Sequence, residues 1–258
     1  MKTYIENFKK YRFLLLELVK KGVKLKYRRS YLGILWTLLE PLLTMIVLSI
    51  VFGTLFGNDD PQFPVYILCG RLMYSFFSSA TNGAMKAIRT NAGMIKKVYV
   101  PKYIYPLSSV LFNYIIFAIS LIVLVVVGIV LKVYPTIYML QALIPLGLIL
   151  VTAFGVGMIL STMAVFFRDL EYLWSVGLMI IMYASAIFYY PERLLNSGFG
   201  WILKCNPLYL LIHNFRQAVF GMPMNMKFLA ASIAFAVVSV IVGLVFFYKK
   251  QDEFILHI

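Results

Sequence analysis

The chain has 258 residues, of which 62% are hydrophobic and only 13% are charged. About 25% of the residues in a soluble domain are charged, so this balance excludes a soluble globular protein and indicates that most of the chain lies in lipid. The formal net charge of +14 does not indicate a nucleic-acid partner, because the basic residues stand beside apolar runs. The two cysteines, Cys69 and Cys205, form neither a disulfide framework nor a metal-ligand pattern.

Residues 4–27 have the periodicity of an amphipathic helix, with apolar side chains on one side and mostly lysines on the other. This pattern predicts a helix in the membrane interface, its lysines facing anionic headgroups or a protein partner. A headgroup anchor alone is the alternative, and Gly22 is a weak point in the pattern. The first thirty residues lack the apolar core and cleavage site of a signal peptide, so we expect nothing to be removed.

Six apolar runs follow, each long enough to cross a bilayer core of about 30 Å as a helix. They cover residues 32–56, 64–84, 104–131, 137–166, 172–190 and 228–248. The pattern predicts an all-α integral membrane protein with six transmembrane helices. Residues 1–258 form one domain, in which residues 1–31 are the interfacial helix, 32–248 the bundle and 249–258 a cytoplasmic tail.

The orientation follows from the lysine and arginine residues beside the spans, because such residues are retained in the cytoplasm. With the N-terminus inside, the cytoplasmic segments hold 18 basic residues and the external segments hold five. The inverted orientation would place the 18 outside. The pattern therefore predicts a multi-pass protein of the cytoplasmic membrane, with both termini in the cytoplasm.

The internal segment between the second and third predicted spans, residues 86–106, carries five basic residues and no acid. Its centre, residues 91–99, is followed by two prolines and predicts a short helix. Exposed apolar residues on that helix, Met94, Ile95 and Val98, would need a partner surface. An ordinary basic loop is the alternative. The other internal loop places Arg168 and Asp169 in a tight turn, which is either a second partner contact or a solvated turn.

Outside the membrane, residues 191–227 are too apolar for a free loop. Asn206 is a typical N-cap, Pro207 a typical first-turn residue and Gly221 a typical stop, so they predict a helix of about 13 residues. Such a helix is too short to span a bilayer. Short re-entrant helices that close an exit path are one interpretation, and interfacial helices without a gating role are the other.

Charged residues within predicted spans indicate function. Glu40 and Arg71 lie at depths that differ by roughly 8 Å, so they can pair, although the sequence does not require it. Arg71 either snorkels outward or faces a path and attracts phosphate. Aromatic residues are dense along the second and fifth predicted spans, where their flat faces suit sugar rings. The candidates for a translocation path are Trp36, Glu40, Arg71, Tyr74, Phe77, Tyr183, Phe188 and Tyr189.

Residues 24–42 read Lys-Leu-Lys-Tyr-Arg-Arg-Ser-Tyr-Leu-Gly-Ile-Leu-Trp-Thr-Leu-Leu-Glu-Pro-Leu. This run resembles the start of the first span in permeases of ABC-2 type polysaccharide and teichoic acid exporters. The resemblance continues in the same order through residues 91–101, through Phe-Phe-Arg-Asp-Leu at 166–170, and through Asn-Pro-Leu at 206–208 with Phe215 and Arg216. It therefore covers essentially the whole chain.

The resemblance implies a homodimer in which two copies of a separate ATPase subunit drive export of a lipid-linked polysaccharide, such as O-antigen, capsule, wall glycan or teichoic acid. The implied ATPase-coupling residues are Asn91, Met94, Ile95, Lys96, Lys97, Val98, Tyr99, Arg168 and Asp169. The implied outer-gate residues are Trp201, Asn206, Pro207, Phe215 and Arg216. Relatives often have Arg-Asp where this chain has Lys21-Gly22, so the contacts of the N-terminal helix are expected to differ.

No glycine in the chain is followed by lysine, so the sequence has no Walker A loop to hold nucleotide phosphates. We expect no cofactor in this chain, with ATP and Mg²⁺ bound by the partner subunit. A secondary transporter or channel is the alternative, but it would be expected to show repeated halves and several intramembrane acids. A membrane enzyme would need clustered acids or histidines, whereas His213 and His257 fall on opposite sides of the membrane.

Overall fold

The computed structural model describes residues 2–28, 30–57, 60–98, 100–196 and 198–257, which form helices and no β-strand. The longer helices are α1 (Lys2–Tyr27), α2 (Trp36–Phe56), α3 (Phe63–Thr90), α5 (Ile104–Val130), α6 (Leu143–Phe166), α7 (Leu170–Tyr183), α10 (Pro207–Val219) and α11 (Met226–Lys250). The short ones are α4 (Ala92–Ile95), α8 (Glu192–Leu195), α9 (Gly200–Cys205) and α12 (Phe254–His257), with 3-10 turns η1 (Gly33–Leu35), η2 (Ile137–Ala142) and η3 (Gln251–Glu253).

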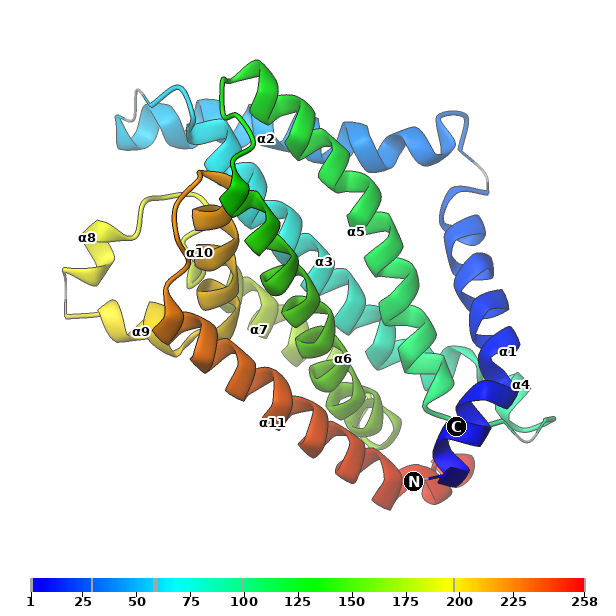
Figure 1. Ribbon diagram of the computed structural model, residues 1–258. Coiled ribbons are helices and arrows are strands. Elements are labelled where there is room, and N and C mark those ends of the chain that lie inside the picture. The colour runs from blue at the N-terminus through cyan, green and yellow to red at the C-terminus, as the bar shows by residue number, and fades with distance from the viewer. Residues whose placement is uncertain (1, 29, 58–59, 99, 197, 258) are drawn as a thin grey trace.

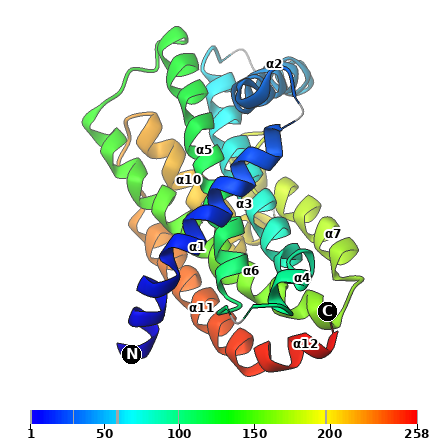
Figure 2. The same ribbon diagram turned by 90° about the vertical axis from the view of Figure 1, so that its right-hand side faces the viewer.

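Helices α5, α3, α6 and α11 run side by side and form the body of the molecule (Figure 1). Helix α2 lies against one end of α3 and α5, and α1 packs along the other half of α5 (Figures 1 and 2). Both termini, α4 and α12 lie at the lower end in both views (Figures 1 and 2). The short helices α8, α9 and α10 lie away from that end, so the bundle has two chemically distinct ends.

Four segments of the described chain are long and apolar enough to cross a membrane: Gly33–Phe56, Ile104–Val130, Ile137–Phe166 and Met226–His257. They correspond to the first, third, fourth and sixth predicted spans. The second predicted span is part of α3, which continues past residue 84 to Thr90 and so carries Lys86 and Arg89 on its last turns.

The fifth predicted span, residues 172–190, differs from the helix that forms. Helix α7 ends at Tyr183 and has 14 residues, which is a length of about 21 Å at 1.5 Å per residue. Ala186 has a positive φ of 47°, and the following Ile187 and Phe188 are buried. The second half of the predicted span is therefore an irregular segment that turns into the protein core.

The apolar side of helix α1 packs against α5. Leu15 and Val19 are buried against Ile104 at the start of α5. Gly22, which weakens the helical pattern, lies directly against α5, because a Cβ atom added at Gly22 would be 2.7 Å from Cδ1 of Phe112. Headgroup anchoring alone therefore does not describe α1, since α5 covers much of its apolar side.

Replacing Gly22 with leucine is expected to loosen α1 from α5 and to lower the stability by about 1–3 kcal/mol, the usual cost of overpacking. The matched control is Glu17→Leu, which adds the same side chain at an exposed position of α1 and keeps every lysine and arginine of the helix. Trypsin cleavage within α1 of the membrane-embedded protein measures the effect. Equal cleavage rates in the two variants would contradict this packing role.

Helices α6 and α11 approach each other through glycine. A Cβ atom at Gly155 would lie 2.6 Å from the backbone carbon of Ser239, and one at Gly243 would lie 2.6 Å from the carbonyl oxygen of Gly155. Small residues permit this approach of two backbones, which is a common basis of helix association in membranes. The pair α6–α11 therefore depends on the absence of side chains at these two positions.

Candidate coupling, translocation and outer-gate sites

The predicted coupling segment, residues 91–99, contains α4, which begins two residues after the last residue of α3. The side chain of Asn91, between the two helices, donates from Nδ2 to the carbonyl oxygen of Ala87 at 2.8 Å and so closes the end of α3. Ile95 is only 7% exposed and packs in a cluster with Ile88, Tyr105 and Phe254. The segment is thus fixed to the bundle by its apolar side.

The burial of Ile95 corrects the expectation that this residue is exposed to a partner. Met94 is partly buried against the same cluster, whereas Lys96, Lys97 and Val98 are exposed. Tyr99 lies outside the described residues. The surface that the segment offers to a partner is therefore basic, with Val98 as its exposed apolar side chain.

The turn between α6 and α7 lies at the same end of the bundle and exposes both Arg168 and Asp169. Glu171, on the first turn of α7, accepts from Lys86 and from Arg89 of α3, each at 2.9 Å. Local sequence gave no signal of these two ion pairs, because the partners are more than eighty residues apart along the chain. They connect α7 to the end of α3 that leads into α4.

The C-terminal residues support the coupling segment. Phe254 of α12 is fully buried, and its ring meets that of Phe247 edge-on with centroids 5.2 Å apart. The ammonium group of Lys102 donates to the carbonyl oxygen of Gln251. The predicted cytoplasmic tail, residues 249–258, therefore folds back onto the cluster that holds Ile95, as far as the described residues extend.

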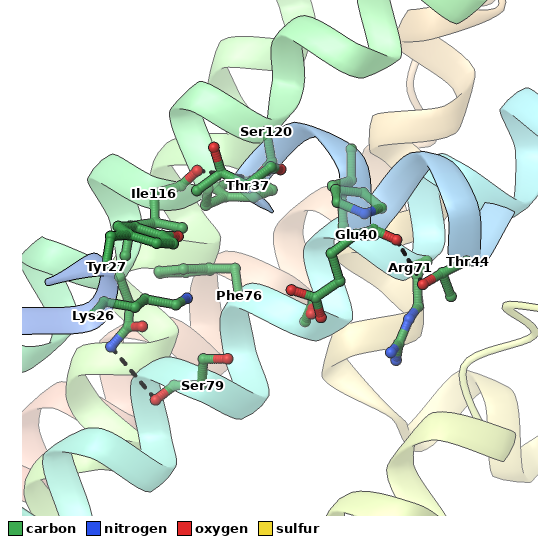
Figure 3. A pocket seen from close by; sticks show the side chains of 15 residues that line it. Lys26, Tyr27, Thr37, Glu40, Thr44, Arg71, Phe76, Ser79, Ile116 and Ser120 are labelled. Carbon is green, nitrogen blue, oxygen red and sulfur yellow. Dashed lines mark hydrogen bonds between the residues drawn. The ribbon is translucent and has the colours of Figure 1, made fainter. Parts of the chain in front are cut away.

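A cavity of about 90 Å³ lies between α1, α2, α3 and α5, and Figure 3 shows the side chains that line it. Glu40 from α2 lies between Lys26 of α1 and Arg71 of α3, and hydroxyl groups such as Ser79 and Ser120 line the wall (Figure 3). Burial lowers the pKa of Lys26, and the charge of Glu40 opposes that shift. Among the ion pairs of the described residues, none joins Glu40 to either cation.

The aromatic path candidates divide into two groups. Trp36 and Tyr183 are exposed, and Tyr189 is half-buried. Tyr74, Phe77 and Phe188 are instead core residues with exposures of 7%, 5% and 5%. The hydroxyl of Tyr74 donates to the carbonyl oxygen of Leu178 of α7, and Phe188 stacks on Phe52 of α2 with ring centroids 4.9 Å apart. These three candidates hold helices together within one chain.

The helix of about 13 residues predicted after Asn206 is confirmed as α10, which has 13 residues. The side chain of Asn206 accepts from the backbone nitrogen of Leu208 as an N-cap, Pro207 occupies the first turn, and Gly221 follows the end with a φ of 72°. Asn206 also donates from Nδ2 to the carbonyl oxygen of Ala184 at 2.9 Å. The cap therefore fixes α10 to the irregular segment after α7.

Arg216 of α10 is only 5% exposed, and each of its three guanidinium nitrogens donates to a backbone carbonyl oxygen. Its Nε, Nη1 and Nη2 atoms donate to the carbonyl oxygens of Tyr66, Ala186 and Ile187 at 3.1, 2.9 and 3.2 Å. The guanidinium carbon lies 3.4 Å from the ring centroid of Tyr66, a cation–π contact. Among the other gate candidates, Phe215 is buried and Trp201 is exposed.

Residues 14–220 match the protein family described as ABC-2 type transporter, and this stretch contains the coupling segment, the α6–α7 turn and α10. The chain belongs to the ABC-2 type transporter family. The resemblance seen at residues 24–42 and at the three later motifs is thereby confirmed at the level of the family.

Relatives of this ABC-2 protein align with it over most of its length. It is 30% identical to an O-antigen export system permease protein, RfbA, of Klebsiella pneumoniae over 243 residues, which are 93% of each chain. It is 31% identical to the RfbA of Myxococcus xanthus over 84% of this chain and 83% of that protein. It is 24% identical to the polysialic acid transport protein KpsM of Escherichia coli over 90% of this chain and 91% of that protein.

Proposed function

We propose that this chain is the permease subunit of an ATP-driven exporter that moves a lipid-linked polysaccharide from the cytoplasm to the outer face of the membrane. The observation that carries the proposal is the family match over residues 14–220, together with relatives named for O-antigen export and polysialic acid transport that cover about nine-tenths of the chain. The ATPase is a separate subunit, present in two copies.

The active unit in this proposal is a homodimer. Helices α2 and α7 support it, because both expose many apolar side chains that the chain itself does not cover: Leu43, Ile46, Val47 and Ile50 on α2, and Leu173, Val176, Ile180 and Tyr183 on α7. Two copies that meet along these helices would place Trp36 and Tyr183 at the interface. Closure of the ATPase subunits separates these helices and opens a path for the glycan.

The proposed membrane arrangement has six spans with both termini in the cytoplasm. Besides the four long apolar segments, α3 and α7 cross the membrane, and α7 is completed by the irregular segment that follows it. Helices α8, α9 and α10 then lie at the outer surface as short re-entrant elements. The excess of basic residues in the segments beside the termini supports this orientation.

Coupling to ATP is assigned to the exposed face of the coupling segment. Lys96 and Lys97 extend from a helix whose other side is fixed in the core. Glu171 of α7 pairs with Lys86 and Arg89 at the end of α3. A force applied to the coupling segment therefore also reaches the turn at Arg168 and Asp169, which precedes α7. The ATPase subunit would therefore need an acidic or hydrogen-bonding groove to receive the two lysines.

The double substitution Lys96→Glu with Lys97→Glu is expected to reduce both ATPase stimulation and glycan export by about tenfold or more, since reversing interface charges costs upwards of about 1.4 kcal/mol. Both side chains are exposed, so the fold is expected to be retained. The measurements are ATP hydrolysis by the purified complex and surface glycan on cells.

The control is Lys204→Glu with Lys227→Glu, which makes the same change in charge at exposed positions of the outer end. Full export and full ATPase stimulation by the Lys96 and Lys97 double variant would remove the coupling assignment. The buried Ile95 is unsuitable for this test, because a charge there would disturb the core before it affected any partner.

A further inference from the structure

The outer end contains a cavity of about 440 Å³ that the transport mechanism does not use. Four parts of the chain form it: the segment before α3, the start of α3, the start of α8 and α10. Its volume lies within the roughly 300–1,000 Å³ of small-molecule sites. It is separate from the proposed dimer surface on α2 and α7.

Aromatic rings make up much of the cavity wall. Tyr66 and Tyr190 meet at a tilt of 58° with ring centroids 4.6 Å apart, and Tyr209 lies 5.9 Å from the ring of His213. Arg216 covers one face of Tyr66 and holds its ring in place. Rigid rings of this kind offer flat apolar contact surfaces at a low cost in side-chain entropy.

Tyr209 has a buried hydroxyl group without a partner. The residue is 1% exposed, and its oxygen makes no hydrogen bond to any of the described residues. An unpaired buried hydroxyl costs about 1–3 kcal/mol, and such groups in a folded protein require an explanation. Because Tyr209 lines the cavity, a ligand with hydroxyl groups would satisfy it.

The polar groups of the cavity suit neutral hydroxyl groups and disfavour anions. Two carboxylates line it with the amides of Gln62 and Gln217: Glu192, and Asp60, which already accepts from the hydroxyl of Tyr190. Carboxylates accept hydrogen bonds and amides both donate and accept them, which matches the alternating hydroxyl groups of a sugar. The one arginine in the wall, Arg216, already donates to three carbonyl oxygens. Burial lowers the pKa of His213, so its imidazole is neutral at pH 7.

We propose that this outer cavity binds a neutral sugar residue of the exported glycan after the glycan has left the membrane path. The inference rests on the proposed function and adds a retaining site at the outer surface. Aromatic faces contact the apolar side of the sugar ring, while Tyr209 and Glu192 bond its hydroxyl groups. A glycan held there would be less free to slide back between ATP hydrolysis events.

The test uses a photo-crosslinking amino acid in the intact transporter, in cells that make their own glycan. Gln217→p-benzoylphenylalanine places the probe in the cavity, and Tyr183→p-benzoylphenylalanine places it on the proposed path. Met226→p-benzoylphenylalanine is the control, since Met226 is 70% exposed and outside the cavity. Neutral sugar attached to the purified permease is measured after irradiation.

We expect sugar adducts from positions 217 and 183 and none from 226. In a background of Tyr209→Phe with Glu192→Gln, the adducts from position 217 are expected to fall about tenfold, a change of about 1.4 kcal/mol, while those from position 183 persist. Gln62→p-benzoylphenylalanine provides a second probe position if the first variant does not accumulate.

The outcomes separate the two proposals. Adducts from position 183 without adducts from 217 or 62 would overturn the cavity inference and leave the export function intact. Adducts from all positions alike, or cavity adducts that contain only acidic sugar or lipid, would also overturn it. An absence of adducts from every position in actively exporting cells would overturn the proposed function itself.

Discussion

Arg216→Met is expected to destabilise the end of the bundle that holds α10 by about 3 kcal/mol or more, because hydrogen bonds from a charged group contribute about 1.5–3 kcal/mol each. Methionine fills similar space but removes the guanidinium donors from the buried carbonyl oxygens of Tyr66, Ala186 and Ile187. The oxygen of Ala186 keeps a second bond, from the hydroxyl of Tyr66. The contact with the ring of Tyr66 is lost as well. Tryptophan fluorescence during thermal unfolding of the purified transporter measures the change.

Two further variants define the role of Arg216. Arg12→Met removes an exposed arginine from α1 and is expected to leave the unfolding temperature nearly unchanged. Arg216→Lys keeps the positive charge but cannot reach three acceptors with one planar group, so an intermediate loss is expected. An Arg216→Met protein as stable as the Arg12→Met protein would contradict the structural assignment.

Gly155→Val is expected to separate α6 from α11 and to prevent accumulation of folded protein. The added atoms would meet the backbone of Ser239 and Val240, each 2.6 Å from the position of a Cβ atom, so rotation of a side chain cannot relieve the clash. Overpacking commonly costs about 1–3 kcal/mol, and a clash between two backbones falls at or above the upper end of that range.

Gly147→Val is the matched control for Gly155→Val, because Gly147 is on the same helix and a Cβ atom there would have no neighbour within 4 Å. Both substitutions introduce the same β-branched residue into α6, so they share its effect on helix propensity. The yield and the size-exclusion profile of the membrane-extracted protein compare them. Equal yields would show that α6 and α11 can repack.

The end of α7 shows where sequence reasoning failed. Residues 172–190 form one continuous apolar run, and nothing before Pro191 signals a break. In the structure, side chains from α10 bind the carbonyl oxygens that a longer helix would have used: Asn206 binds that of Ala184, and Arg216 binds those of Ala186 and Ile187. Tertiary hydrogen bonds thus replaced helical ones, which no local pattern could indicate.

The boundaries of α10 could be predicted from local sequence, whereas the orientation of α4 could not. The start and end of α10 are set by residues with strong local preferences: Asn206 as the N-cap, Pro207 in the first turn and Gly221 after the last turn. The sequence therefore sufficed to predict both ends of this helix. For α4, the sequence predicted a short helix but not which side faced the protein. Ile95 is buried because Tyr105, Phe247 and Phe254 gather around it from distant parts of the chain.

The candidate site could be predicted only in part for a related reason. Family resemblance and apolar patterning indicated which segments matter, including the coupling segment and α10. Burial then separated exposed Trp36 and Tyr183 from Tyr74 and Phe77, which hold helices together. Periodicity alone does not distinguish an aromatic residue that faces a path from one that faces a neighbouring helix.

The docking of α12 has a practical consequence for labelling this protein in cells. Phe254 packs with Ile95, so a fluorescent protein or affinity tag joined to the chain just after α12 would lie beside the surface that we propose receives the ATPase. Such a fusion would obstruct assembly and resemble a loss-of-function allele. Reporters are better inserted in the connection between α5 and η2 near residues 132–136, remote from that surface.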